Sequence, residues 1–133
     1  MPLSSLSLLE SATITPSGGT AMPFALAGSP VNNQVKAYAT GDTDLRTRRS
    51  IDFTVKEPKV SATAPNQYTQ ARCSFYIKVP FALDNGATTT NSVKFEMAYD
   101  AEATQAEVLE MRKLAAQAII DGDLDEFYNN LSL

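Results

Sequence analysis

The sequence contains no histidine, no tryptophan and only one cysteine, Cys73, among its 133 residues. Without histidine, the chain cannot form a Ser-His-Asp triad, a Cys-His pair or an imidazole-bound zinc site. A single cysteine excludes an internal disulfide and a Cys-x-x-Cys site. We therefore expect a protein that is not an enzyme and that carries no cofactor and no metal. We expect Cys73 itself to be a buried small hydrophobic residue.

Long apolar runs are also missing. The stretch Phe24–Ala27 is far shorter than the roughly 18–20 residues that cross a bilayer. Residues 1–5 have no basic stretch ahead of an apolar core, so we expect no signal peptide, no membrane partner and a reducing, cytosolic environment. Apolar residues make up 44% of the chain, which is typical of a globular protein, and its length suits one domain over residues 1–133.

Charge is distributed unevenly along a chain whose net charge is −4. Residues 36–78 carry eight basic and four acidic side chains, whereas residues 79–133 carry three basic and ten acidic ones. This pattern predicts two surfaces of different charge. The alternative is an ordinary solvated surface with uneven charge, and charge alone does not favour either interpretation.

Three segments alternate between apolar and polar residues with a period of two: residues 51–56, 72–79 and 92–97. Such alternation predicts strands of an antiparallel sheet with one covered and one solvated face. The sequence Asp84-Asn85-Gly86 predicts a turn between the second and third of these strands. The apolar set is Ile51, Phe53, Val55, Cys73, Phe75, Ile77, Val79, Val93, Phe95 and Met97.

The first fifty residues give weaker signals. Leu6, Leu8 and residues 13–15 suggest an N-terminal hairpin with a turn near residues 16–19. Residues 33–38 suggest another strand, followed by a turn at residues 41–44.

The pattern changes to helical at about residue 100. Residues 100–120 are rich in good helix formers, and the sequence from Thr104 to Glu107 fits a capping box. Gly122 is a helix-end signal, and Asp123 is expected to cap a second helix that continues to Leu131. The predicted fold is therefore α+β, with an N-terminal hairpin and an antiparallel sheet of about five strands over residues 1–100, then two helices over residues 101–133 that cover one face of the sheet. One pair of helices is small for such a sheet, so we expect a symmetric dimer that shares its helices.

This order of elements resembles the coat proteins of small single-stranded RNA bacteriophages, the levivirus family. The resemblance spans most of the chain, although it is weak residue by residue and rests on the order and lengths of the elements. Four stretches carry it: residues 48–56, 72–80, 93–99 and 103–120.

The resemblance implies an intertwined homodimer with a continuous sheet, and many dimers that close into an icosahedral capsid. It implies that the loop around Asp84-Asn85-Gly86 lies at the symmetry axes. The inward sheet face would bind a hairpin of the genomic RNA, repress translation of the replicase and mark the genome for packaging. The protein would be found in the virion, and in the bacterial cytoplasm during assembly.

The RNA-binding residues that the resemblance suggests lie on the polar face of the strands. Lysine and arginine suit phosphates, hydroxyls suit bases in pockets, and a tyrosine can stack on a base. The set is Arg49, Thr54, Lys56, Arg72, Ser74, Tyr76, Ser92 and Lys94, and Lys78 is predicted to lie on the same face. The alternative is an ordinary solvated sheet face, which carries the same residue types.

The chain departs from the family at the last strand. The family often places a stacking tyrosine there, where this chain has Thr90 and Ser92, and Asp52 and Glu96 add negative charge to the same face. These departures weigh against recognition of a specific hairpin more than against general packaging of RNA. A second hypothesis is an RNA-binding module that uses the same face without assembling, and a small enzyme is a third.

Overall fold

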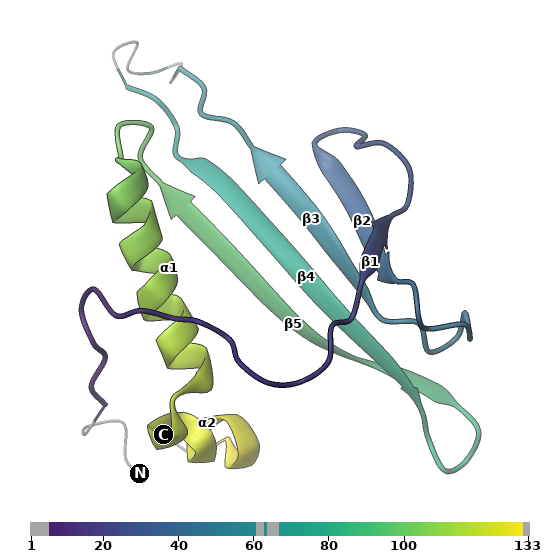
Figure 1. Ribbon diagram of the computed structural model, residues 1–133. Helices are drawn as coiled ribbons and strands as arrows, with labels where there is room; N and C mark the ends of the chain where they lie inside the picture. The colour runs from purple at the N-terminus through teal and green to yellow at the C-terminus, as the bar shows by residue number, and fades with distance from the viewer. Residues whose placement is uncertain (1–5, 61–62, 64–66, 132–133) are drawn as a thin grey trace. The chain divides into compact units, whose positions relative to one another are not determined.

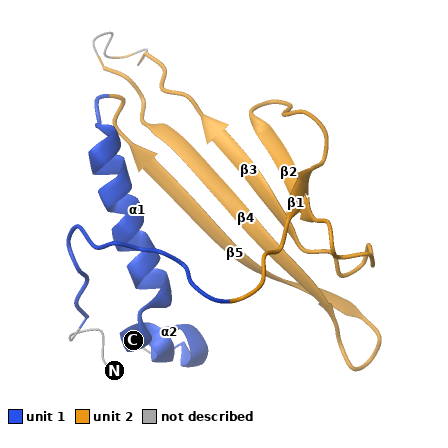
Figure 2. Ribbon diagram, in the orientation of Figure 1, with its two compact units in different colours: residues 1–18, 102–133 blue, residues 19–101 orange. Residues whose placement is uncertain are grey.

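The computed structural model describes residues 6–60, 63 and 67–131 of the chain (Figure 1). The described chain divides into two compact units (Figure 2). One unit comprises residues 19–101 and holds the sheet. The other joins residues 1–18 to residues 102–133 and holds the helices. No helix within the described ranges is long and apolar enough to cross a membrane.

The sheet unit is a five-stranded antiparallel meander in which strand order follows the sequence. This confirms the predicted sheet of about five strands, and the three segments of alternating sequence lie within the last three strands. The strands are β1 (Phe24–Leu26), β2 (Gln34–Ala39), β3 (Ser50–Lys56), β4 (Ala71–Ala82) and β5 (Thr88–Tyr99).

The strand register places the apolar residues of alternating sequence on one face. Phe53 in β3 lies opposite Phe75 in β4, which lies opposite Phe95 in β5. Directly opposed residues share a face of a sheet, so these three side chains form one apolar row. The rings of Phe75 and Phe95 stack with their centroids 5.2 Å apart.

The N-terminal hairpin lies later in the chain than predicted. Residues 6–23 contain no strand, and the first hairpin is formed by β1 and β2. The bend at Gly18 and Gly19 is present, with both residues at positive φ, but it does not join two strands. Residues 6–18 belong instead to the helical unit.

The N-terminal segment is held by helix side chains, which explains this difference. In α1 (Gln105–Ile120), the Gln117 amide accepts from the Leu9 N–H at 2.8 Å and donates to the Leu9 carbonyl at 2.9 Å. The Glu110 carboxylate accepts from the Ser11 N–H at 2.7 Å. These side chains satisfy backbone groups that a strand partner would otherwise satisfy.

Helix boundaries confirm one predicted cap and correct another. The Thr104 hydroxyl accepts from the Glu107 N–H at 3.2 Å at the start of α1, as the capping box predicts. After α1, a short turn η2 (Gly122–Leu124) precedes α2 (Asp125–Asn130). Asp121 caps η2, and its carboxylate accepts from the Asp123 N–H at 2.9 Å. α2 itself follows Leu124 and has no side-chain cap, so the prediction that Asp123 caps the second helix is wrong: Asp123 lies within η2 instead.

Few apolar side chains are fully buried in either unit of the single chain. Among the described residues, the buried hydrophobic set is Ala37, Ala39, Met97 and Leu124. On the apolar sheet face, Phe53 and Val79 are 39% exposed, and Val93 is 56% exposed. Cys73 is half-buried on the same face. The apolar face therefore retains a large uncovered area, and coverage of that face by helices stays a prediction.

Candidate nucleic-acid interface

The polar face of the sheet gathers seven of the eight predicted RNA-binding residues. Thr54 lies opposite Ser74, and Lys56 lies opposite Arg72. Tyr76 lies opposite Lys94. Because side chains alternate between the faces of a strand, this register places the set on the face opposite the phenylalanine row. Its members are Thr54, Lys56, Arg72, Ser74, Tyr76, Ser92 and Lys94.

Positive charge predominates on this polar face, although the whole chain is acidic. By register the face carries five cations and two carboxylates. The face is therefore positively charged, whereas the whole chain has a net charge of −4. The cations are Lys36, Lys56, Arg72, Lys78 and Lys94, and the carboxylates are Asp52 and Glu96.

Both carboxylates on the polar face are paired with cations. Arg72 Nη1 lies 3.0 Å from Glu96 Oε1, and Lys78 Nζ lies 2.9 Å from Asp52 Oδ2. Each pair links neighbouring strands and cancels the negative charge that would repel a phosphate. Exposed pairs of this kind add little stability, so their main effect is to fix where the cations lie.

Three lysines on the polar face remain without an ion pair within the described part of the chain: Lys36, Lys56 and Lys94. Their flexible stems can bring an ammonium group to different positions along a backbone of phosphates. The face therefore offers three uncompensated charges to a polyanion.

Tyr76 is the oriented aromatic residue at the centre of this face. Its hydroxyl donates to Ser92 Oγ at 3.1 Å, which ties β4 to β5. Lys78 Nζ lies 5.1 Å from the centroid of the ring. The sequence predicted Tyr76 and Ser92 as separate contacts, and the structure shows that Ser92 also orients the tyrosine.

A shallow hollow of about 190 Å³ lies between β3, β4 and β5. Four predicted residues line it, Thr54, Lys56, Arg72 and Ser74, together with Val55, Cys73 and Glu96. The hollow brings hydroxyl groups for hydrogen bonds next to cations for phosphates, which is the combination that single-stranded RNA requires.

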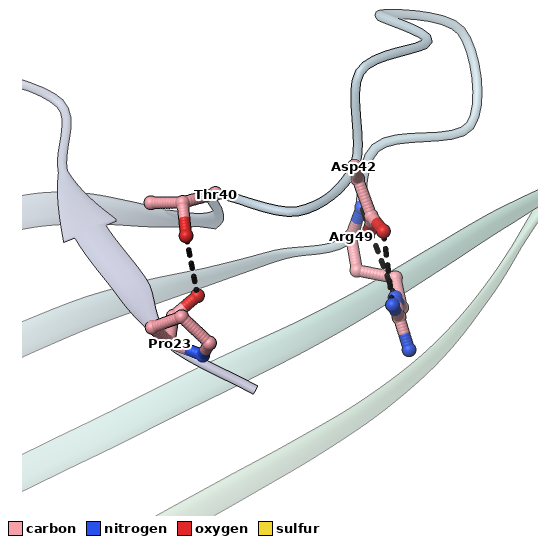
Figure 3. A network of polar contacts seen from close by, with 4 residues as sticks. All are labelled: Pro23, Thr40, Asp42 and Arg49. Atoms are coloured by element: carbon pink, nitrogen blue, oxygen red, sulfur yellow. Dashed lines mark hydrogen bonds and ion pairs between the residues drawn. The ribbon is translucent and has the colours of Figure 1, made fainter. Parts of the chain in front are cut away.

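Arg49 is the exception among the predicted residues. It precedes β3, and its side chain forms an ion pair with Asp42 in the loop between β2 and β3 (Figure 3). The Nε–Oδ2 and Nη2–Oδ1 distances are 2.8 and 2.9 Å, and the Arg49 N–H donates to Oδ2 at 3.0 Å. Beside this pair, the Thr40 hydroxyl donates to the Pro23 carbonyl at 3.3 Å. The Arg49 guanidinium therefore already has an anionic partner.

The Asp42–Arg49 pair should make loop stability depend on acidity. The side-chain hydrogen bonds from Arg49 lower the pKa of Asp42 from 3.8 to about 2. A carboxylate with a lowered pKa in the folded state stabilises that state at neutral pH, and this contribution is lost as the pH falls from about 4 to about 2. We expect Asp42→Asn to lower the midpoint of thermal unfolding at pH 7, and the difference from the native protein to shrink as the pH falls from about 4 to about 2.

Glu57→Gln is the matched control, because Glu57 is an exposed carboxylate with no ion pair within the described ranges. It should leave the midpoint at pH 7 unchanged. An Asp42→Asn protein as stable as the native one at pH 7 would show that the pair does not stabilise the fold.

Sequence reasoning missed two members of the polar face, Lys36 and Tyr38 in β2. They alternate with Val35, Ala37 and Ala39, so the period-two signal was present. Alanine is a weak marker of an apolar face, and this concealed the pattern.

Comparison with known proteins gives matches among solved structures. No protein-family model matches the sequence, and no curated protein matches it. The chain is similar to the virus-like particle of bacteriophage GQ-907, with a TM-score of 0.89 and 29% identity over 99% of each chain. It is also similar to two levi-like virus particles with lower identity.

The virus-like particle of Beihai levi-like virus 21 matches with a TM-score of 0.69 and 12% identity, over 96% of this chain and 98% of that chain. The particle of Beihai levi-like virus 32 matches with a TM-score of 0.72 and 11% identity, over 86% of this chain and 90% of that chain. These two matches concern the fold alone. Together the three confirm the resemblance that the order of elements indicated.

Proposed function

We propose that this chain, which has the fold of levi-like bacteriophage coat proteins, is a capsid subunit that assembles around single-stranded RNA. The observation that supports it most directly is the similarity to the particle of bacteriophage GQ-907 along nearly the whole chain. A capsid protein is a structural protein, so this proposal requires no catalytic site. The protein would reside in the virion, and in the host cytoplasm during assembly.

The uncovered apolar surface supports a homodimer as the building block. The apolar sheet face exposes Phe53, Val55 and Val93, and α1 contains no buried residue. Large exposed apolar patches are typical of interaction surfaces. A second copy that lays its helices on this face would cover both surfaces at once.

The outer strand offers a place for the two sheets to join. β5 has twelve residues, lies at the end of the strand order, and pairs only with β4 among the described strands. A long edge strand presents unpaired N–H and carbonyl groups to another chain. Pairing of two copies through β5 would give one continuous antiparallel sheet whose polar face doubles in width.

The charge and chemistry of the polar face support RNA as the ligand. Three unpaired lysines offer charges to phosphates, Tyr76 offers a ring to a base, and Thr54 and Ser74 offer hydroxyls. Arg72 and Ser92 complete the proposed contact set, whereas Arg49 contributes least because Asp42 occupies its guanidinium. More specifically, we propose that the face binds a hairpin of the genomic RNA and thereby represses translation of the replicase.

Expression of the protein alone, followed by sedimentation and negative-stain electron microscopy, tests the proposal. We expect closed particles of megadalton size that contain RNA and release it in high salt. If only monomers or dimers form across a range of salt and RNA concentrations, capsid assembly is refuted. A salt-dependent RNA complex without particles would favour the alternative, an RNA-binding module that does not assemble.

A further inference from the structure

The loop between β2 and β3 carries three arginines, and two of them are paired with carboxylates. Arg46 Nη2 lies 3.2 Å from Asp44 Oδ2, and Arg49 donates hydrogen bonds to the Asp42 carboxylate from two guanidinium nitrogens. Arg48 makes neither an ion pair nor a hydrogen bond through its side chain with any residue that the structure describes. It is therefore the one arginine of this loop without an ion pair among the described residues, although its charge lies close enough to Asp42 to help lower the pKa of that carboxyl.

An aromatic ring, and not a carboxylate, holds Arg48 in place. Its Cζ atom lies 4.6 Å from the centroid of the Tyr38 ring, within the range of a cation–π contact. Its Nε is buried without a hydrogen-bond partner. Contact with the ring therefore orients the guanidinium, and Arg48 as a residue remains partly exposed to solvent.

The register places this pair on the polar face. Tyr38 lies opposite Ser50, which lies opposite Lys78. Neighbouring strands are about 4.8 Å apart, so Tyr38 and Lys78 are separated by about 10 Å across the sheet. Lys78 itself stands over Tyr76 at 5.1 Å. One face thus carries two tyrosines, each with a cation above its ring.

We infer that Arg48 and Tyr38 form a second base-stacking site for single-stranded RNA, next to the site at Tyr76. This inference rests on the proposed function. Unpaired RNA bases stack on arginine planes as well as on aromatic rings, and the charge of Arg48 complements the neighbouring phosphates. A single RNA segment that crosses β2, β3 and β4 meets both sites. Arg48, and not Arg49, is then the loop residue that contacts RNA, because Arg49 is already paired with Asp42.

The test measures binding of the full-length protein to a labelled single-stranded oligoadenylate by fluorescence anisotropy over a range of salt concentrations. Arg48→Ala should weaken binding about tenfold, the size expected for loss of one stacking contact. Arg48→Lys should keep the native salt dependence of binding but show most of the affinity loss expected for Arg48→Ala. Lysine keeps the positive charge but lacks the planar guanidinium on which a base can stack. Tyr38→Phe should bind as the native protein does.

Arg46→Lys is the matched control, and we expect it to change affinity less than about twofold because Arg46 lies in the same loop and the charge that faces Asp44 is kept. Circular dichroism checks that each variant is folded. If Arg48→Ala does not fold, the Arg48→Lys variant decides. Native affinity in that variant overturns the inference.

Lys56→Glu separates failure of this inference from failure of the proposed function. If the Arg48 variants bind as the native protein does while Lys56→Glu loses affinity, the second stacking site is refuted and RNA binding by the face stands. If Lys56→Glu also binds normally, the sheet face does not bind RNA and both proposals fall.

Discussion

Replacing Val93 with aspartate should abolish particle formation while leaving the single chain able to fold. Val93 lies on the apolar face and is 56% exposed in the single chain, so the new carboxylate is solvated there. In the proposed dimer the same position is covered, and an unpaired buried carboxylate costs several kcal/mol. The population of assembled protein should therefore fall by more than about a hundredfold, which sedimentation measures directly.

The neighbouring residue provides the control. Ser92→Asp adds the same charge one position earlier on the opposite face of β5. Particles should still form, but they should package less RNA because the new charge repels phosphates. Val93→Thr keeps the shape of the side chain and should assemble. Particles of normal yield from Val93→Asp would mean that this face is not an interface between subunits.

Reversing the charge of Lys56 should have opposite effects on RNA affinity and on stability. Lys56 lies directly opposite Arg72, and like charges at opposed positions of a sheet destabilise it. In Lys56→Glu the new carboxylate faces Arg72, so the midpoint of thermal unfolding should stay the same or rise. Affinity for single-stranded RNA should fall about tenfold or more at low salt, with the slope against log salt reduced by about 0.7 for one lost phosphate contact.

Lys56→Arg keeps the charge and is the matched control for this reversal. It should bind RNA with native affinity and a native salt slope. A loss of affinity in Lys56→Glu that is accompanied by unfolding would attribute the effect to structure rather than to RNA contact. Anisotropy titrations and thermal melts on the same samples distinguish these outcomes.

The sheet was predictable where the alternation is strong and was misplaced where it is weak. In β3 and β4 a large apolar residue occupies nearly every second position, so the two faces follow from the sequence itself. Around Leu6 and Leu8 a similar but weaker pattern suggested strands. There the backbone groups of Leu9 instead bond to Gln117, which lies more than a hundred residues later, and no local pattern reveals such a partner.

The candidate site was predictable as a set of residues but not as a set of interactions. The period-two alternation of the strands predicted that Thr54, Lys56 and Tyr76 share one face, and the strand register confirms this placement. Whether Arg48 or Arg49 stays available to a ligand depended on which of them meets Asp42. The sequence shows two adjacent arginines with no difference between them.

By itself, the sequence determined the strand faces, the change from strands to helices near residue 100 and the absence of histidine chemistry. These properties depend on residue type and on the period of the backbone, which are local. Only the tertiary structure decided the cross-strand partners, the loop ion pairs and the ring beneath Arg48. Those depend on register and loop closure, which bring together residues whose spacing in the sequence carries no information about their contacts.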